Sequence, residues 1–142
     1  MAFVHGKDIA FQLDDAAGTL RAIKLYLNAV SGLPGARALS EVTAFGDQGT
    51  RYIPGLSNVT FSIGGHFDST ALVGTATVLN GLRTATATAS FEYGPEGSTT
   101  GKVKFTGECW LTELSIDASV SDRVPIAASF QVDGVVTVGV YP

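Results

Sequence analysis

The stretch that decides the fold is Ala87-Thr-Ala-Ser-Phe-Glu-Tyr-Gly-Pro-Glu-Gly-Ser-Thr-Thr-Gly-Lys-Val-Lys-Phe-Thr-Gly-Glu-Cys-Trp-Leu111. On both sides of its glycine-rich centre, residues 94–101, apolar side chains recur at every second position. This period is typical of β-strands with one buried face, and clustered glycine, serine and threonine are typical of a turn. The stretch therefore predicts two antiparallel strands joined by a turn.

The same alternation continues outward along the chain. It predicts further strands over residues 9–13, 22–27, 59–64, 124–132 and 135–141. A turn at residues 14–18 joins the first two into a hairpin, and Asp133-Gly134 is a strong two-residue hairpin signal. The apolar phase slips by one residue between Leu111 and Leu114, which predicts a β-bulge because Leu114 would otherwise face water.

One helix is predicted, over residues 69–82. Its apolar residues have helical spacing, its N-cap is Asp68 or Ser69, and Gly81 lies where a C-cap glycine belongs. These apolar residues are Leu72, Ala76, Leu79 and Leu82. The predicted fold is mainly β: an antiparallel β-sandwich or flattened barrel of about seven strands, with one short α-helix and a single domain over residues 1–142.

A long inter-strand loop is predicted over residues 28–57. Connections longer than about 12–15 residues without structure of their own are normally disordered or functional. This one carries aromatic and branched apolar residues, which disordered segments lack. We expect it to become ordered by lying against another copy of the same protein.

Composition favours self-association. Charged residues make up 15% of the 142-residue chain, against roughly 25% in an average soluble domain, while hydrophobic residues make up 45%. So little charge fits a chain that hides much of its surface in subunit contacts, or a marginally soluble monomer. A net charge of -4, with nine scattered Lys and Arg, argues against tight nucleic-acid binding.

The remaining counts exclude other classes. The single cysteine, Cys109, excludes an internal disulfide and a multi-cysteine zinc site. A signal peptide and the roughly 18 apolar residues of a membrane span are both missing, so we expect a soluble protein made in the cytoplasm.

No catalytic or metal site is predicted. Residues 94–102 only superficially resemble a phosphate-binding loop, because Val103 replaces the magnesium-binding hydroxyl and a strand follows. His66 and Asp68 give two metal ligands where at least three are needed. Cys109 lies in a strand and is interpreted as a small buried hydrophobe. Because no acid–base pair or activated nucleophile can be assembled, we expect no enzyme activity and no cofactor.

An ordered set of short motifs resembles the tail tube (major tail) proteins of long-tailed bacteriophages with non-contractile tails. The motifs are Asp14-Asp-Ala-Ala-Gly-Thr-Leu20, Ser31-Gly-Leu-Pro34, Thr43 with Phe45-Gly-Asp47, Pro54-Gly-Leu56, Gly65-His-Phe-Asp68, Phe91-Glu-Tyr-Gly-Pro95 and Gly101-Lys-Val-Lys-Phe105. The resemblance runs over nearly the whole chain. It implies a virion protein, made in the cytoplasm of a host bacterium, whose six-copy rings stack into a hollow tube.

The resemblance also implies partners: other copies of the chain, a tape measure protein, and terminator and tip proteins. In this family DNA passes through the tube at infection, without specific binding.

Two sets of site residues follow from this interpretation. In the 28–57 segment, Phe45, Tyr52 and Ile53 are predicted apolar anchors for stacking rings, and Asp47 and Arg51 are predicted polar specifiers. The alternating polar residues before Tyr93 are predicted to line the lumen, or else to form the outer solvent surface. These polar residues are Thr86, Thr88, Ser90 and Glu92.

Two other functions stay open at this point. A tube protein of a contractile tail or secretion-like machine shares the expected architecture. A carbohydrate-binding β-sandwich would need exposed aromatic residues on one face, and Trp110, Tyr93 and Tyr141 are the residues available for such a platform.

Overall fold

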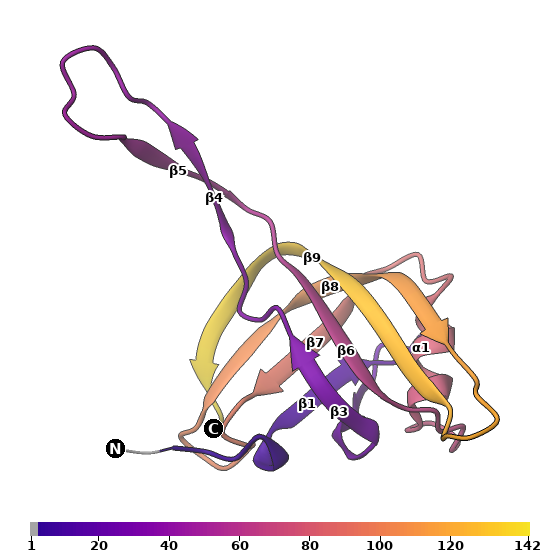
Figure 1. Ribbon diagram of the computed structural model, residues 1–142. Helices are drawn as coiled ribbons and strands as arrows, with labels where there is room; N and C mark the ends of the chain where they lie inside the picture. Colours follow the sequence, from indigo (N-terminus) through magenta and orange to yellow (C-terminus); the bar gives the residue numbers. More distant parts are fainter. Residues whose placement is uncertain (1–2) are drawn as a thin grey trace.

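The computed structural model describes residues 3–142. Within this range seven strands form one antiparallel sheet in the order β2-β1-β7-β8-β9-β6-β3, and β4 and β5 form a separate two-stranded sheet (Figure 1). The strands are β1 (Ala10–Asp14), β2 (Leu20–Ala22), β3 (Leu27–Ser31), β4 (Arg37–Glu41), β5 (Tyr52–Ser57), β6 (Thr60–His66), β7 (Ala89–Gly94), β8 (Val103–Ile116) and β9 (Pro125–Val140). The helices are α1 (Thr75–Leu82) and the 3₁₀ turns η1 (Gly6–Asp8) and η2 (Lys24–Tyr26). The predicted antiparallel, mainly β fold with one short α-helix is confirmed.

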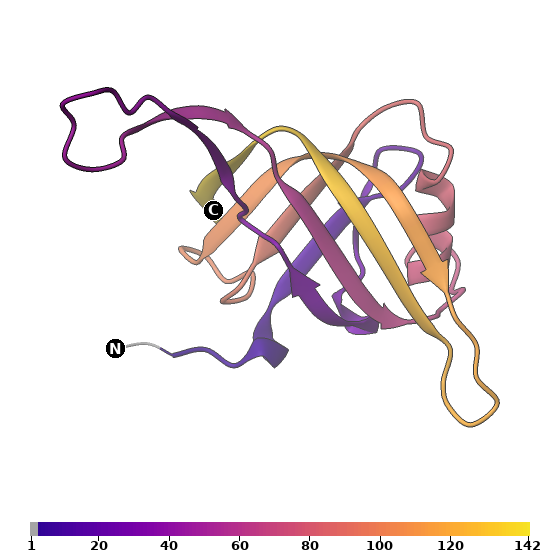
Figure 2. The ribbon, with the colours of Figure 1, turned by 45° about the horizontal axis from the view of Figure 1, so that its top comes forward.

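The seven-stranded sheet curls around its own core, in the form of a flattened barrel (Figures 1 and 2). Phe11 of β1 and Phe61 of β6 come from strands near opposite ends of the strand order, yet their ring centroids are 6.3 Å apart. Phe61 also lies 4.8 Å from Phe130 and 4.9 Å from Phe91. Each of these four rings is almost fully buried, which is worth about 1.5–3 kcal/mol per side chain.

Helix α1 covers one end of this core, packing on β8 and β9 (Figure 1). Its buried side consists of Ala76, Val78, Leu79 and Leu82. The hydroxyl of the buried Thr75 donates a hydrogen bond to the carbonyl of His66, at 2.6 Å. The spacing of Ala76, Leu79 and Leu82 in the sequence therefore identified the correct face.

The beginning of the helix was predicted wrongly. Helix α1 starts at Thr75 after Gly74, not at residue 69, and Leu72 precedes it as an exposed residue with φ +73°. The Asp68 carboxylate accepts a hydrogen bond from the Thr70 amide at 2.8 Å, and the Asp68 backbone carbonyl accepts one from the Ala76 amide at 2.9 Å. The expected capping residue thus closes a turn ahead of the helix.

Two further boundaries differ from the predicted ones: the end of the helix and the end of the second strand of the first hairpin. Gly81 lies inside α1, and Arg83 takes the C-cap position. The predicted strand over residues 22–27 ends at Ala22, because the buried Ile23 leads into the turn η2 and only then into β3.

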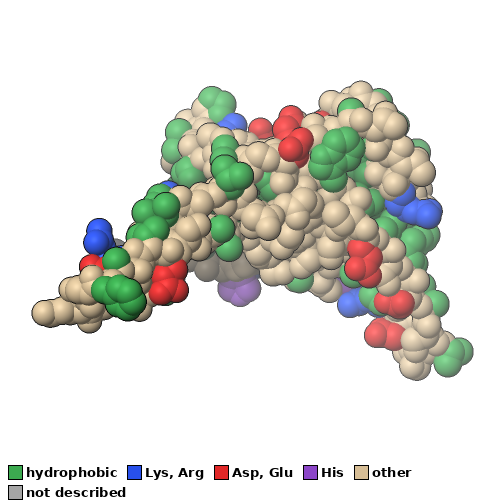
Figure 3. All heavy atoms as spheres, turned by 90° about the horizontal axis from the view of Figure 1, so that it is seen from above, with side chains coloured by type: hydrophobic (Ala, Val, Ile, Leu, Met, Phe, Trp, Pro, Cys, Tyr) green, Lys and Arg blue, Asp and Glu red, His purple; other side chains and the backbone are tan. Residues whose placement is uncertain are grey.

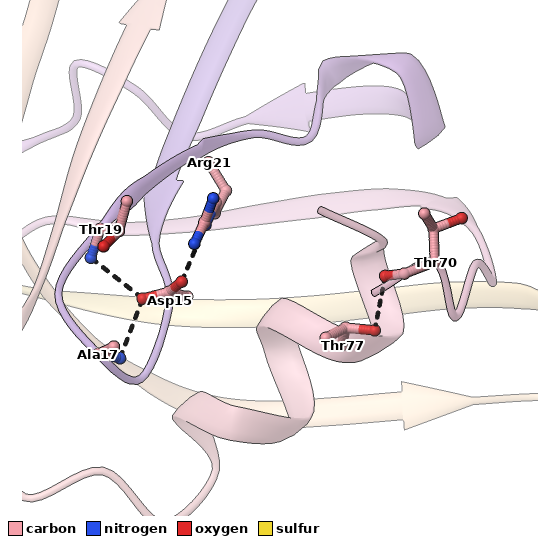
Figure 4. Close-up of polar contacts among 6 residues, drawn as sticks. All are labelled: Asp15, Ala17, Thr19, Arg21, Thr70 and Thr77. Atoms are coloured by element: carbon pink, nitrogen blue, oxygen red, sulfur yellow. Dashed lines mark hydrogen bonds and ion pairs between the residues drawn. The ribbon is translucent and has the colours of Figure 1, made fainter. Parts of the chain in front are cut away.

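The β1–β2 hairpin itself is present as predicted. Asp15 closes its turn by accepting hydrogen bonds from the amides of Ala17 and Thr19, at 2.9 and 3.0 Å (Figure 4). The same carboxylate forms an ion pair with Arg21 at 2.9 Å. The Thr19 amide, followed by the Arg21 guanidinium, holds the pKa of Asp15 below its usual value.

Strands β8 and β9 pair along almost their whole length, with two irregularities. Leu111 lies opposite Phe130 and Glu113 opposite Ser129, so β8 carries one extra residue there, and the predicted bulge is confirmed. The predicted hairpin at Asp133-Gly134 is wrong, because β9 continues through both residues without a turn. Gly134, with φ +94°, lies in a bulge where β9 pairs with β8 on both sides, and this pairing overrides the local turn signal.

The segment predicted as a long inter-strand loop, residues 28–57, contains three strands. Strand β3 joins the main sheet beside β6. Strands β4 and β5 form a β-hairpin that projects far from the sheet (Figures 1 and 2). We call residues 37–57 the arm.

Candidate assembly interface

The arm exposes apolar side chains on both of its faces. Because side chains alternate across a strand, Leu39 shares one face with its partner Pro54 and with Tyr52. Ile53, opposite Ser40, lies on the other face. Tyr52 is 54% and Ile53 51% exposed. A hairpin that covered a single surface would be polar on its outer face, so this pattern suits an arm enclosed on both sides.

The tip of the arm is an ordered turn with one apolar projection. Asp47 accepts a hydrogen bond from the Ala44 amide at 2.8 Å and pairs with Arg51 at 3.4 Å. The Arg51 amide donates to the Thr43 hydroxyl at 2.9 Å. Phe45 is fully exposed. Asp47 and Arg51 thus hold the turn that presents Phe45.

The base of the arm is fitted tightly against the sheet. Gly32, at φ +98°, approaches the backbone of Thr60 and Phe61 so closely that a Cβ atom would lie 2.6 Å from the Thr60 carbonyl oxygen. A Cβ on Gly35, at φ +112°, would overlap the Val59 side chain. Bulk at either glycine would therefore displace the arm from the body.

All five residues predicted for stacking lie in the arm. Tyr52 and Ile53 lie in β5, while Phe45, Asp47 and Arg51 lie at or beside the tip. Sequence reasoning did not assign a stacking role to three other exposed apolar residues of the arm, Leu39, Val42 and Leu56. The apolar content of residues 37–57 was the signal that could have identified them. Figure 3 shows apolar side chains along the arm beside charged ones.

The residues predicted for the lumen divide into two places. Ser90 and Glu92 lie in β7 and point away from the core, because Phe91 between them is buried. Ser90 donates a hydrogen bond to Glu108 at 2.8 Å, and Glu92 forms an ion pair with Lys104 at 3.6 Å.

Thr86 and Thr88 lie in the connection before β7, not in a strand as predicted. They border a shallow depression that is also lined by the β1–β2 turn and the end of α1. The structure therefore gives two polar regions instead of one continuous strand face.

The outer face of β7 and β8 carries an excess of acidic groups. Glu108 lies directly opposite Asp133 of β9, so two carboxylates are cross-strand neighbours on this face. Glu92 is a third carboxylate on this face. These three negative charges outnumber the one positive charge of Lys104, which pairs with Glu92. Like charges placed opposite each other lower the stability of a sheet. The pair Glu108 and Asp133 therefore does not serve to stabilise the fold.

The polar residues considered for chemistry form no catalytic arrangement. Burial, followed by the charges of Glu108 and Asp14, raises the pKa of Cys109 to about 12, so its thiol is protonated at neutral pH. A side-chain hydrogen bond from Thr70 lowers the pKa of the Asp68 carboxyl. Within residues 3–142 no group of three His, Cys, Asp or Glu side chains could hold a metal ion.

No helix in the described part of the chain is long and apolar enough to cross a membrane.

The three aromatic residues proposed as a carbohydrate platform are dispersed. Tyr93 packs towards the core, 6.3 Å from Phe11. Trp110 lies on the outer side of β8, next to the buried Cys109. Tyr141 lies beside Lys104, whose ammonium is 5.4 Å from its ring. Lys104 is six positions before Trp110 in β8, a distance of roughly 20 Å along the strand.

The chain matches no family model and no curated protein, but it matches solved structures over nearly its full length. One match is a chain in the virion of a native gene transfer agent particle: TM-score 0.76, 16% identity, covering 96% of this chain and 99% of that one. A second is the SPP1 tail tube: TM-score 0.73, 12% identity, covering 97% and 80%. A third is the PVC sheath/tube terminator of an extracellular contractile injection system: TM-score 0.70, 13% identity, covering 98% of each chain.

These likenesses define the class of fold. The chain has the fold of tail tube proteins, in agreement with the resemblance that its motifs carry. The fold occurs both in the SPP1 tail tube and in a contractile injection system.

Proposed function

We propose that this protein is a tail tube subunit of a bacteriophage-like particle. Copies of it form rings, and the rings stack into a hollow tube through which DNA is delivered. The observation that carries the proposal is the arm: a projecting hairpin with apolar side chains on both faces, attached to a tail tube fold.

The arm supplies a reason to self-associate. A lone two-stranded hairpin is at best marginally stable in water, and this one projects without support from the sheet. Its exposed apolar residues are Leu39, Val42, Phe45, Tyr52, Ile53 and Leu56. Burying them against other copies stabilises the contact by on the order of 5–10 kcal/mol. This is of the size needed to offset the lost freedom of the associating copies.

A contact made by the arm would favour a filament. An arm that reaches a different surface on the next copy makes a head-to-tail contact, and such contacts propagate unless they close into a ring. We infer that arms link successive rings along the tube axis. Phe45, Tyr52 and Ile53 are the anchors of this contact, while Asp47 and Arg51 set the tip that presents Phe45.

Rings of six copies are the expected closed unit. The family resemblance implies six, and the tail of an empty gene transfer agent particle, with C6 symmetry, contains a chain of the same fold. Closing a ring also protects the edges of the main sheet, which would otherwise be free to pair with unrelated strands.

The acidic outer face of β7 and β8 suits a lumen. DNA is densely anionic, so a wall carrying Glu92, Glu108 and Asp133 does not bind its phosphates. On this proposal Ser90 and Glu92 face the passage, and the like-charged pair Glu108 and Asp133 is retained to keep the wall weakly repulsive. Thr86 and Thr88 lie at the margin of that wall.

The particle supplies the other partners. We propose a location in the virion tail after synthesis in the cytoplasm of a host bacterium, with a tape measure protein inside the tube and terminator and tip proteins at its ends. These partners follow from the tail tube resemblance. No cofactor or catalytic step belongs to this function.

A tube of a contractile machine is the second proposal. It is favoured by the match to the sheath/tube terminator of the PVC injection system. A sheath that co-purifies with particles of this protein would support the contractile form. Bare tubes in particles would support the non-contractile form.

Negative-stain electron microscopy of the purified protein tests the proposal. We expect sixfold rings and stacked tubes with an open centre as the concentration rises. A chain that stays monomeric at high concentration, and that is missing from the particles encoded beside its gene, would overturn it.

A further inference from the structure

The main sheet leaves an open seam with a pocket. Within residues 3–142, strand β3 pairs with β6 alone, which leaves one of its edges unpaired. A pocket of about 640 Å³ lies between that strand, η1 and η2. Its apolar lining includes Ile9, Leu25, Leu27 and Tyr93. Leu25 is 78% exposed. The pocket has the size of sites that hold a substantial ligand, and here it is a gap in the wall of the barrel.

The pocket has a basic rim. Lys7 and Lys24 are the charged residues that line it, and both are exposed. None of the three ion pairs found within residues 3–142 includes either lysine. An occupant that combines an apolar projection with carboxylates would therefore match this pocket.

The connection between β8 and β9, residues 117–124, has those properties. Val120 at its tip is fully exposed, flanked by two serines, and Asp117 and Asp122 stand three and two residues away. Neither aspartate belongs to an ion pair within the described residues. Arg123 offsets one of the two negative charges. We call residues 117–124 the acidic loop.

A chain does not fill its own pocket with this loop. In both ribbon views the acidic loop projects from the end of the sheet beside α1, away from η1 (Figures 1 and 2). The loop and pocket are different surfaces, so a contact between them on two copies is head-to-tail and can close into a ring. The arm tip complements the two lysines of the pocket less well than the acidic loop does, because the Asp47 carboxylate is already paired with Arg51.

We propose that the acidic loop of one copy docks in the seam pocket of its neighbour within the ring. Val120 enters beside Leu25, and Asp117 and Asp122 approach Lys7 and Lys24. This inference rests on the proposed function and adds the lateral contact to it. The loop supplies apolar contact, while the charges select the register of the two copies.

Charge reversal provides the test. We expect Lys7→Glu with Lys24→Glu, and separately Asp117→Lys with Asp122→Lys, to raise the concentration at which rings form by about tenfold or more. Combining all four substitutions should restore assembly to within about threefold of wild type. The control Lys102→Glu, an exposed lysine outside the pocket, should assemble normally, and circular dichroism should show every variant folded.

Disulfide trapping provides a second measurement. In Leu25→Cys with Val120→Cys, oxidation with diamide should link neighbouring copies into a ladder that ends at the ring size, since Cys109 is buried. Neither single variant should form the ladder. If wild type forms tubes but the four-substitution variant is no better than its parents, or no ladder appears, this inference is overturned and the proposed function stands. A wild-type chain that forms no rings would overturn both.

Discussion

Replacing Phe45 and Tyr52 with serine should separate folding from assembly. Phe45 is fully exposed and Tyr52 is 54% exposed, so neither contributes much to the stability of the isolated chain. On the proposed function, both become buried when rings stack. Burial of a large apolar side chain is worth about 1.5–3 kcal/mol, and Tyr52 has roughly half of that left to gain.

The double variant should therefore lose about 3 kcal/mol from each arm contact, which weakens that contact by roughly 100-fold. If rings stack through these contacts, as proposed, the concentration needed for tubes should rise by a similar factor. Sedimentation velocity over a dilution series, with negative-stain images of the pellets, measures this concentration. The temperature of unfolding, recorded by circular dichroism, should stay within a few degrees of wild type.

Leu72→Ser is the matched control, since Leu72 is 61% exposed but lies outside the arm. It removes an exposed apolar side chain from another part of the surface and should leave the tubes unchanged. If the Phe45/Tyr52 variant formed tubes at the wild-type concentration, the arm would not be the stacking contact. A variant that unfolded would show instead that the arm supports the monomer.

Other substitutions test the core, the first turn and the wall of the passage. Phe61→Ala should lower the free energy of unfolding by about 3–5 kcal/mol in urea titrations, with Phe61→Leu losing less, because three aromatic rings lie around Phe61. Asp15→Ala should lower stability by about 1 kcal/mol at neutral pH. The pKa of Asp15 is lowered in the folded state, so the loss of unfolding free energy relative to wild type should be complete above about pH 4. This loss should disappear as the pH falls through the folded-state pKa, and a pH-independent loss would contradict the role of the Asp15 carboxylate. Glu92→Lys should permit assembly but slow genome release in an infection assay, and a reconstruction with Glu92 on the tube exterior would refute the lumen assignment.

Patterns of burial were readable from the sequence because the alternation within each strand indicates which side is inside. Phe61 and Ile63 in β6, and Phe91 in β7, lie on the predicted buried face. The bulge after Leu111 was also readable, since an inserted residue shifts the apolar pattern of a strand by one position. These features depend on neighbours within a few residues.

Features that depend on distant pairing were misread. Asp133-Gly134 has the composition of a tight turn, but β8 offers partners on both sides of it and the strand continues. Asp68 has the chemistry of a helix cap but binds Thr70 ahead of the helix. Thr86 and Thr88 alternate like strand residues, although no strand in the described part of the chain pairs with them.

The arm was foreseen as a functional segment but not as a hairpin. Its length and apolar content predicted an external contact. Its strands carry apolar residues on both faces, so the one-sided alternation that reveals a half-buried strand is blurred. Which surface of a neighbour receives each anchor residue depends on the assembled particle and is therefore not encoded in any local pattern.

Separation of the arm from the core has a consequence for tube length. No residue of the buried core lies between Ile23 and Val59, so a chain whose residues 37–57 are replaced by a short glycine-rich turn should still fold. On the proposed function, such a chain would keep every surface except the one that binds the next ring. Mixed with the natural protein at low ratios, it would act as a chain stopper, and the mean filament length would shorten in proportion to its dose.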